Sequence, residues 1–347
     1  MKSLRDIRQS EFADLAFNKK KGLLHLASRF GKIKTCFNFI KSTDQVLVIY
    51  PKAPIKQSWI DESKNWEFDI SNFSFSTTSS LSKVKNNKYD WVIWDEPQEV
   101  LSDRVLSSVK ELVKNNNVIG LSGSLSKNTK SIIRQKTGLN IIAEYPTSLA
   151  IKEGVICDYK IHVQYVNLEP SLKYKYDWYT TKINDAIASG NRKQTKFFAL
   201  SRMRLLHSSK NKLNYVKKII EHFAGQRLIV FSHLTKFVDE LGISVYHSKN
   251  KNEKTLDDFK NGLINQLATL DMISAGISFK KLNRAVVATF TSNTEELYQR
   301  INRITALEMD NPSKKAIVYI VCIRNSQEEN WLTKALKMFD PDKIKYK

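Results

Sequence analysis

The 347-residue sequence has few cysteines and no cysteine pattern. Cys36, Cys157 and Cys322 lie far apart and lack the spacing of a metal site or a disulfide framework. We therefore expect a reducing compartment, the cytoplasm. The sequence also has no metal-ligand cluster that would indicate a nuclease, and no internal repeats or low-complexity tracts.

Long apolar runs are missing as well. No stretch is long enough to span a bilayer, and the N-terminus, MKSLRDIRQSEF, lacks the apolar core of a signal peptide. No amphipathic basic helix is obvious, so we do not expect a membrane surface as a partner.

Acidic residues are the scarcer charged class. The sequence has 35 Asp and Glu against 56 Lys and Arg, which gives a net charge of +21 and a pI near 9.7. A field of this sign suits a polyphosphate partner, most simply DNA or RNA. The length predicts two domains, each large enough to bury its own core.

Residues 22–35 predict an apolar strand, a tight turn and the start of a helix. At the turn, Gly31 and Lys32 form the core of a phosphate-binding loop, in which the lysine reaches the β- and γ-phosphates. The full pattern G-x-x-x-x-G-K-[ST] is not met, because Leu26 replaces the first glycine and Ile33 replaces the Ser or Thr. Taken alone, the segment favours an ordinary Gly-Lys turn ahead of an amphipathic helix.

An acidic pair and a hydroxyl-bearing turn follow two further predicted strands. The apolar run 89–94 delivers Asp95 and Glu96 at its C-terminal end, where open α/β sheets bind ligands. Asp95 could hold Mg²⁺ through water, and Glu96 could activate the attacking water. The strand over 117–121 ends in Ser122-Gly123-Ser124. An ordinary acidic turn explains the pair alone, but the order of phosphate loop, acidic pair and hydroxyl turn is that of a nucleoside-triphosphate hydrolase core.

The remaining pattern also alternates between helices and strands. In the first half we expect helices over 4–20 and 32–41, a buried parallel strand over 45–50, a helix that carries Trp59 and Trp66, and a short strand over 73–76. In the second half we expect a mainly helical stretch over 170–222, a final helix over 326–339, and strands over 161–168, 226–231, 244–248, 284–290 and 316–323.

The helical stretch 170–222 mixes cations with aromatic residues. Lys173, Lys175, Lys182, Arg192, Lys193 and Lys196 stand among Tyr174, Tyr176, Trp178 and Tyr179. Such interleaving can grip phosphates and stack bases. A helix with a solvated basic face and an aromatic core face explains the pattern equally well, so both interpretations stay open.

The motif order resembles that of the superfamily 2 helicases and translocases, and is similar to phage DNA helicases and the motor domains of type III restriction enzymes. Residues 27–32 resemble motif I, and Asp95-Glu96-Pro97-Gln98 resembles the DExx/DExH motif II. The other similar segments are 4–9 (entry motif), 48–51 with 57–59 (Ia), 120–124 (III), 145–159 (the passage out of the first motor domain), 226–232 (IV), 267–279 (V) and 299–303 (VI).

This resemblance implies an α/β fold class with two RecA-like domains, each a mainly parallel sheet flanked by helices, joined by a helical connector. We place the first domain over 1–160, the connector over 161–224 and the second domain over 225–347. The implied function is a nucleic-acid-dependent ATPase that acts as a DNA helicase or translocase and uses ATP and Mg²⁺. RNA is the alternative partner, and partners in replication, recombination or repair are not identified. The implied location is a bacterial or phage-infected host cytoplasm.

The resemblance also implies residue roles. The catalytic set is Lys32, Asp95, Glu96, Arg303 and Arg300, with Asp95 as the metal-binding residue. The nucleotide-binding set is Gln9, Ala27, Ser28, Arg29, Phe30, Gly31, Lys32, Ile33, Gly276 and Gln299. The set that contacts nucleic acid is Pro51, Lys52, Ser124, Ser232, His247 and Ser274, although His247 also fits a purely structural role.

Two departures from the motifs support a rival hypothesis. Ile33 lacks the hydroxyl that ligates Mg²⁺, and Thr35 cannot replace it because two helical residues rotate the side chain by about 200°. Ala306 stands where motif VI has its second arginine, a charge worth orders of magnitude in rate. A catalytically weakened or inactive helicase-fold protein that serves as a DNA-binding scaffold is therefore the alternative. The retained motif residues favour an active ATPase: Lys32, Asp95, Glu96 and Arg303.

Overall fold

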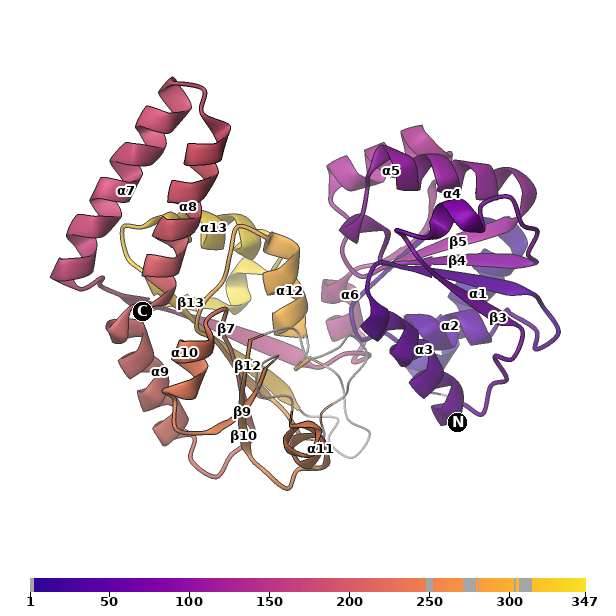
Figure 1. Ribbon diagram of the computed structural model, residues 1–347. Helices are drawn as coiled ribbons and strands as arrows, with labels where there is room; N and C mark the ends of the chain where they lie inside the picture. The colour runs from indigo at the N-terminus through magenta and orange to yellow at the C-terminus, as the bar shows by residue number, and fades with distance from the viewer. Residues whose placement is uncertain (1–2, 248–251, 271–278, 280, 303, 306–313) are drawn as a thin grey trace. The chain divides into compact units, whose positions relative to one another are not determined.

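The computed structural model describes residues 3–247, 252–270, 279, 281–302, 304–305 and 314–347. The chain divides between Ile156 and Cys157 into two compact units. Each unit contains one sheet whose strand pairs are parallel throughout the described residues. This confirms the expected fold class of two parallel-sheet α/β domains with flanking helices (Figure 1).

The first unit has a six-stranded sheet in the order β3-β2-β4-β5-β1-β6. Its strands are β1 (Lys21–Leu26), β2 (Val46–Tyr50), β3 (Phe73–Thr77), β4 (Trp91–Asp95), β5 (Asn117–Ser122) and β6 (Ile141–Tyr145). Every residue of β2 and β4 is buried, which explains their unbroken apolar sequences, because helices cover a parallel sheet on both faces.

Helices cover both faces of this first sheet (Figure 1). They are α1 (Leu4–Lys19), α2 (Lys32–Phe37), α3 (Ala53–Asn65), α4 (Asp103–Asn115), α5 (Lys127–Thr137) and the short α6 (Thr147–Lys152). One apolar cluster joins α1, α2 and α3 to one face of the sheet, through residues such as Ala13, Cys36 and Trp59. A second cluster joins α4 and α5 to the other face, through Val109 and Ile133.

Two elements of the first unit differ from the sequence-based expectation. The helix expected over 32–41 ends at Phe37, because the N–H groups of Phe39 and Ile40 both bond the carbonyl of Cys36 and form a turn. Strand β6 was not predicted. It is an edge strand whose first two residues are only half-buried, so it lacks the continuous apolar run that identified its neighbours.

The second unit has a seven-stranded sheet in the order β13-β7-β12-β11-β8-β10-β9. Its strands are β7 (Asp158–Val166), β8 (Leu228–Phe231), β9 (Ser244–Tyr246), β10 (Gln266–Thr269), β11 (Arg284–Val287), β12 (Lys315–Ile323) and β13 (Ile344–Tyr346). Its described helices are α7 (Pro170–Ala188), α8 (Arg192–His207), α9 (Lys210–His222), α10 (Thr235–Asp239), α11 (Glu253–Asn261), α12 (Thr294–Asn302) and α13 (Gln327–Leu336).

The segment expected as a connector is largely built into this second unit. Strand β7 pairs with β12 along its whole length, and α9 packs Leu213, Val216 and Ile220 into the core of the second sheet. Residues 161–166 therefore form a strand of the second sheet.

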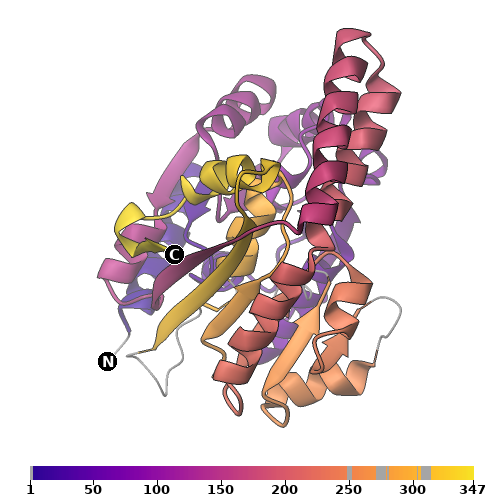
Figure 2. The ribbon, with the colours of Figure 1, turned by 90° about the vertical axis from the view of Figure 1, so that its left-hand side faces the viewer.

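Helices α7 and α8 form an antiparallel pair that extends beyond the second sheet (Figures 1 and 2). Their base is anchored by a small core of Tyr176, Leu205, Leu206 and Ile323. We call this pair the α7–α8 hairpin.

Candidate functional site

Three neighbouring strands of the first sheet end at one edge and carry the predicted nucleotide-site residues. In the order β4-β5-β1, strand β4 ends at Asp95, β5 ends at Ser122, and β1 leads through residues 27–31 into α2. Parallel strands present their carboxyl ends at the same edge, so residues that are distant in sequence meet there. Nζ of Lys32 lies 3.1 Å from Oε1 of Glu96, and Gly123 lies against Lys32 as well.

The loop over residues 27–31 has a fixed, tightly turned backbone. Phe30 anchors it, because its buried ring packs 5.1 Å from the ring of Tyr145. Arg29 and Gly31 have φ angles of 66° and 96°, both in the left-handed region. The loop therefore reverses direction between β1 and α2 around an apolar anchor.

Gln9 supports this loop from α1. Its buried Nε2 donates to the carbonyl of Phe30 at 2.9 Å and to that of Gly31 at 3.4 Å. A Cβ atom at position 31 would lie 2.4 Å from the same nitrogen, so glycine is needed both for the positive φ and for this close approach. The nucleotide contact implied for Gln9 stays a prediction; its amide bonds the loop backbone.

Gly123 packs closely against the lysine and a serine of the loop. A Cβ at this position would lie 3.2 Å from Nζ of Lys32 and 2.5 Å from Oγ of Ser28. A side chain here would displace both groups, so glycine lets the turn after β5 lie directly against a lysine ammonium and a serine hydroxyl, two groups that can bind phosphate oxygens.

Thr35 does not replace the hydroxyl that Ile33 lacks. The Ile33 side chain packs partly buried against the apolar core of the first unit. The hydroxyl of buried Thr35 donates to the carbonyl of Gly31 at 3.2 Å, one turn earlier in the same helix. The Thr35 hydroxyl is therefore directed to the backbone of its own helix and not to the phosphate loop's ligand side, as the helical spacing predicts.

The carboxylate of Asp95 is buried and is held by a tryptophan. Nε1 of Trp59, on α3, donates to Oδ2 of Asp95 at 2.9 Å. Burial and the negative charge of Glu96 together raise the pKa of Asp95 to about 7, while Lys32 and the Trp59 hydrogen bond oppose that rise. A cation bound next to Asp95 would therefore stabilise the ionised carboxylate.

Glu96 turns back toward Lys32 directly after β4. Its φ is 49°, and its N–H bonds the carbonyl of Leu121 in the next strand. Nε2 of Gln98 donates to the Glu96 carboxylate, and Oγ of Ser122 donates to Oε1 of Gln98 at 2.7 Å. A continuous chain of polar contacts thus runs from Lys32 through the acidic turn to the end of β5.

Sequence reasoning gave no role to two residues of this site. Gln98 was visible as the last residue of the motif II segment, and its spacing from Glu96 was the available signal. Trp59 lies 36 positions before Asp95, and no sequence signal connects the two.

In the second unit, Arg300 is buried among polar groups at the ends of β8 and β11. Its guanidinium pairs with Oε1 of Glu296 at 2.7 Å and donates to the carbonyl of Thr289 at 3.1 Å. Burial alone would raise the pKa of Glu296, but the hydrogen bond with His233 and the charge of Arg300 outweigh it and lower the pKa to about 2. Arg300 is therefore engaged inside its own unit, whereas Gln299 precedes it on α12 and is half-buried.

The residues expected to contact nucleic acid have varied surroundings. Ser124 and Ser232 are buried, and His247 is buried with its Nε2 3.1 Å from Oδ1 of Asp239. Lys52 is exposed and pairs with Glu99 at 2.5 Å, and Pro51 is half-buried. No contact with nucleic acid is tested by this geometry, so these roles stay predictions.

Four residues named from the sequence lie outside the described residues. They are Ser274, Gly276, Arg303 and Ala306.

Comparison with known proteins agrees with this architecture. Residues 211–305 match the family model described as the helicase conserved C-terminal domain. The chain is similar to Saccharomyces cerevisiae Dbp5 bound to RNA and ADP BeF3, with a TM-score of 0.61 and 12% identity over 94% of this chain and 85% of that chain. It is also similar to the Pyrococcus furiosus Hef helicase domain, with a TM-score of 0.56 and 12% identity over 96% of this chain and 100% of that chain.

This chain has the fold of these helicase structures, two parallel-sheet α/β domains with flanking helices. The helicase-fold protein has no match among curated protein sequences. None of its described helices is long and apolar enough to cross a membrane.

Proposed function

We propose that this helicase-fold protein is a nucleic-acid-dependent ATPase that moves on, unwinds or remodels DNA. The observation that carries the proposal is the convergence of Lys32, Asp95, Glu96 and Gly123 at one edge of the first sheet. A bacterial or phage-infected cytoplasm is the proposed setting.

In this proposal Lys32 binds the β- and γ-phosphates of ATP. Its ammonium now pairs with Glu96, and the phosphates would compete for it. Glu96, released from the lysine, would accept the proton of the attacking water, and Gln98 would hold its carboxylate in place. The loop over 27–31 and the turn at Gly123, which packs against Ser28 and Lys32, would surround the phosphates.

The residues present fit a magnesium ion. Mg²⁺ is usually held by one or two carboxylates together with substrate phosphates, and Asp95 is a buried carboxylate whose negative charge is disfavoured by burial and by Glu96. Bound Mg²⁺ would neutralise charge on the β- and γ-phosphate oxygens. Trp59 would orient Asp95 toward that ion.

The remaining catalytic role, stabilisation of transition-state charge, is proposed for an arginine. We propose Arg303 as the residue that stabilises charge on the transferred phosphoryl group, as its position in the motif implies. Arg300, buried against Glu296, would act by fixing α12. Gln299 and Gly276 remain the proposed nucleotide contacts of this unit, and the proposed nucleic-acid contacts are Pro51, Lys52, Ser124, Ser232, His247 and Ser274.

The test is ATP hydrolysis by the purified protein with single-stranded DNA, duplex DNA or RNA. We expect stimulation by DNA, and a loss of at least about 100-fold in Lys32→Ala because the phosphates lose their charged donor. Lys34→Ala is the matched control, because Lys34 lies on the same helix over the ring of Trp66. Absence of DNA-stimulated hydrolysis, or an unchanged Lys32→Ala, would refute the proposal, and stimulation by RNA alone would replace DNA as its substrate.

The environment of Ile33 favours one second candidate, a DNA-binding scaffold without catalysis. Ile33 packs on the core and Thr35 bonds within α2, so neither supplies the usual hydroxyl ligand. Ile33→Thr should raise the hydrolysis rate if the missing hydroxyl limits an active enzyme. DNA binding without hydrolysis in both proteins would instead favour the scaffold.

A further inference from the structure

We propose that the α7–α8 hairpin is a second binding surface, one that takes single-stranded nucleic acid. Unpaired bases would stack on its exposed aromatic side chains, and cations of α8 would contact the phosphates. This inference goes beyond the proposed function, because binding at the hairpin requires neither ATP nor the nucleotide site.

The first observation is a set of aromatic side chains that leave the core. Tyr174, Trp178 and Phe197 are 77%, 46% and 63% exposed, whereas Tyr176 is buried at the base. The Trp178 ring lies 5.8 Å from that of Phe198, which lies 5.4 Å from that of Phe197. The interpretation as a core face therefore fails for Tyr174 and Trp178. The ring contacts through Phe198 fix the positions of Trp178 and Phe197 before a ligand binds.

The second observation is the regular arrangement of α8. Lys193, Phe197, Leu200 and Arg204 are all exposed and follow the spacing i, i+4, i+7 and i+11, which places them on one helix face. We call this set the α8 stripe. The stripe has a cation at each end and two apolar side chains between them. Lys196 lies beside it, three positions after Lys193.

Charge selects the kind of partner. Helix α8 carries five Lys and Arg and no Asp or Glu. The two acids of α7 are both paired with lysines, Asp177 with Lys173 at 2.6 Å and Asp185 with Lys182 at 3.7 Å. The α8 side of the hairpin therefore presents unbalanced positive charge, which suits a polyanion.

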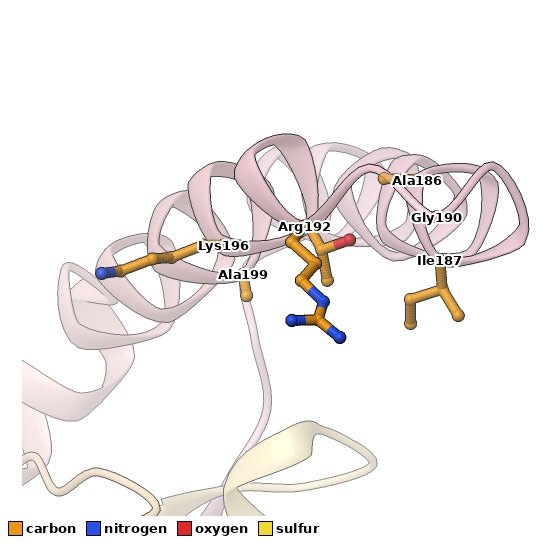
Figure 3. Close-up of a pocket in the computed structure, with 7 residues that line it drawn as sticks. Ala186, Ile187, Gly190, Arg192, Lys196 and Ala199 are labelled. Carbon is orange, nitrogen blue, oxygen red and sulfur yellow. The ribbon is translucent and has the colours of Figure 1, made fainter.

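A hollow at the hairpin tip is also lined by both cationic and apolar side chains. It has a volume of about 410 Å³ and is lined by Ala186, Ile187, Gly190, Arg192, Thr195, Lys196 and Ala199. Arg192 and Ile187 point to the same side of the hairpin there (Figure 3). A guanidinium beside an apolar side chain suits a phosphate next to a base or sugar.

The aromatic side chains select single strands over duplexes and acidic proteins. A base stacks on an aromatic ring only when its π face is open, and such stacking tolerates any sequence. Duplex bases are already stacked on each other, and an acidic protein would use the cations without needing Trp178 or Phe197.

The experiment measures binding of the full-length protein to a fluorescent 20-nucleotide oligo(dT) by anisotropy, at fixed salt and without ATP. Phe197→Ala should weaken binding about 5- to 100-fold, the effect of losing one stacked base. Phe197→Trp should restore it, and Leu263→Ala, an exposed leucine outside the hairpin, should leave it unchanged. Photocrosslinks from 5-iododeoxyuridine should map to Trp178, Phe197 or Tyr174.

Unchanged binding by Phe197→Ala, with crosslinks outside 170–207, would overturn the inference. An equal loss of binding to a blunt duplex would also overturn it, because stacking would then not be the interaction. The experiments distinguish failure of the hairpin proposal from failure of the proposed ATPase function. Lys32→Ala should keep Phe197-dependent binding, whereas Phe197→Ala should keep the maximal hydrolysis rate at saturating DNA.

Discussion

At the scale of single residues, the charged groups of the proposed nucleotide site have partners within the protein. Lys32 pairs with Glu96, Glu96 accepts from Gln98, and Asp95 accepts from Trp59. Each of these three groups thus has a protein partner that fixes its position. Such positioning restricts the side chains before a ligand arrives, which reduces the entropy cost of binding.

The hydrogen bond from Trp59 to Asp95 can be measured through stability. Trp59→Phe should lower the free energy of unfolding by about 1–3 kcal/mol, because the buried carboxylate loses its donor. Trp66→Phe removes a similar bond, from Trp66 Nε1 to Glu62 Oε2 at 2.9 Å, but at an exposed position. Trp66→Phe should lower the free energy of unfolding by less than about 0.5 kcal/mol. Urea titration of both variants measures the two values. Equal effects would contradict the role given to Trp59.

Gly31 provides a second test at this scale. Gly31→Ala should destabilise the protein by more than Gly138→Ala, although both glycines have positive φ, 96° and 82°. A Cβ at Gly31 meets Nε2 of Gln9 at 2.4 Å, whereas nothing lies within 4 Å of a Cβ at Gly138. We expect about 1 kcal/mol for Gly138→Ala from the backbone conformation alone. Thermal melts would show the difference, and shortening Gln9 to alanine should reduce it.

At the scale of helices and strands, α5 and α4 allow a matched capping experiment. Oγ of Ser126 accepts from the N–H of Thr129 at 3.1 Å, whereas Ser102 precedes α4 without a side-chain cap. Ser126→Ala should therefore cost about 1 kcal/mol, and Ser102→Ala should cost little. Urea midpoints of the two variants would decide, and a larger effect at Ser102 would contradict the assignment.

The contact of α12 with the ends of β8 and β11 should be sensitive to acid. The pKa of Glu296 is lower in the folded protein, at about 2, than its ordinary 4.5, so its stabilisation is present above about pH 4.5 and is lost as the pH falls toward 2. Glu296→Gln should cost about 2–3 kcal/mol at pH 7 and less at pH 3. Comparison of unfolding free energies at the two pH values measures this.

Glu240 provides the control for that experiment. It makes an exposed contact with Lys236 at 3.8 Å, which contributes little to stability. Glu240→Gln should therefore change the unfolding free energy by less than about 0.5 kcal/mol at both pH values. A cost of Glu296→Gln that does not depend on pH would show that the carboxylate acts only through packing.

The elements of the site were predictable where burial shaped the sequence. Strands β2, β4 and β5 are covered on both faces, so their apolar runs identified them, and the order of phosphate loop, acidic pair and hydroxyl turn indicated one site. Edge strand β6 and the Trp59 contact were not predictable. The first is half-exposed, and the second depends on how α3 is rotated against the sheet.

At the scale of the whole molecule, the charge of +21 should dominate nucleic-acid affinity. We expect affinity for single-stranded DNA to fall by at least about 100-fold between 50 and 200 mM salt, because bound phosphates release counterions. The slope of log affinity against log salt measures this. A paired Lys193→Ala and Arg204→Ala change should make the slope shallower, whereas Phe197→Ala should leave it unchanged. A slope near zero would contradict an electrostatic partner.

The strand order also determines when each sheet can form during synthesis. All six strands of the first sheet lie within residues 21–145, so that unit has its full set of strands early. Strand β7 opens the second unit but lies between β12 and β13, and β12 begins only at Lys315. At ribosomal speeds of about 5–20 residues per second, β7 leaves the ribosome roughly 10–30 s before its partner. For that interval β7 lacks both of its sheet neighbours, so a chaperone that binds extended apolar segments would have time to bind it.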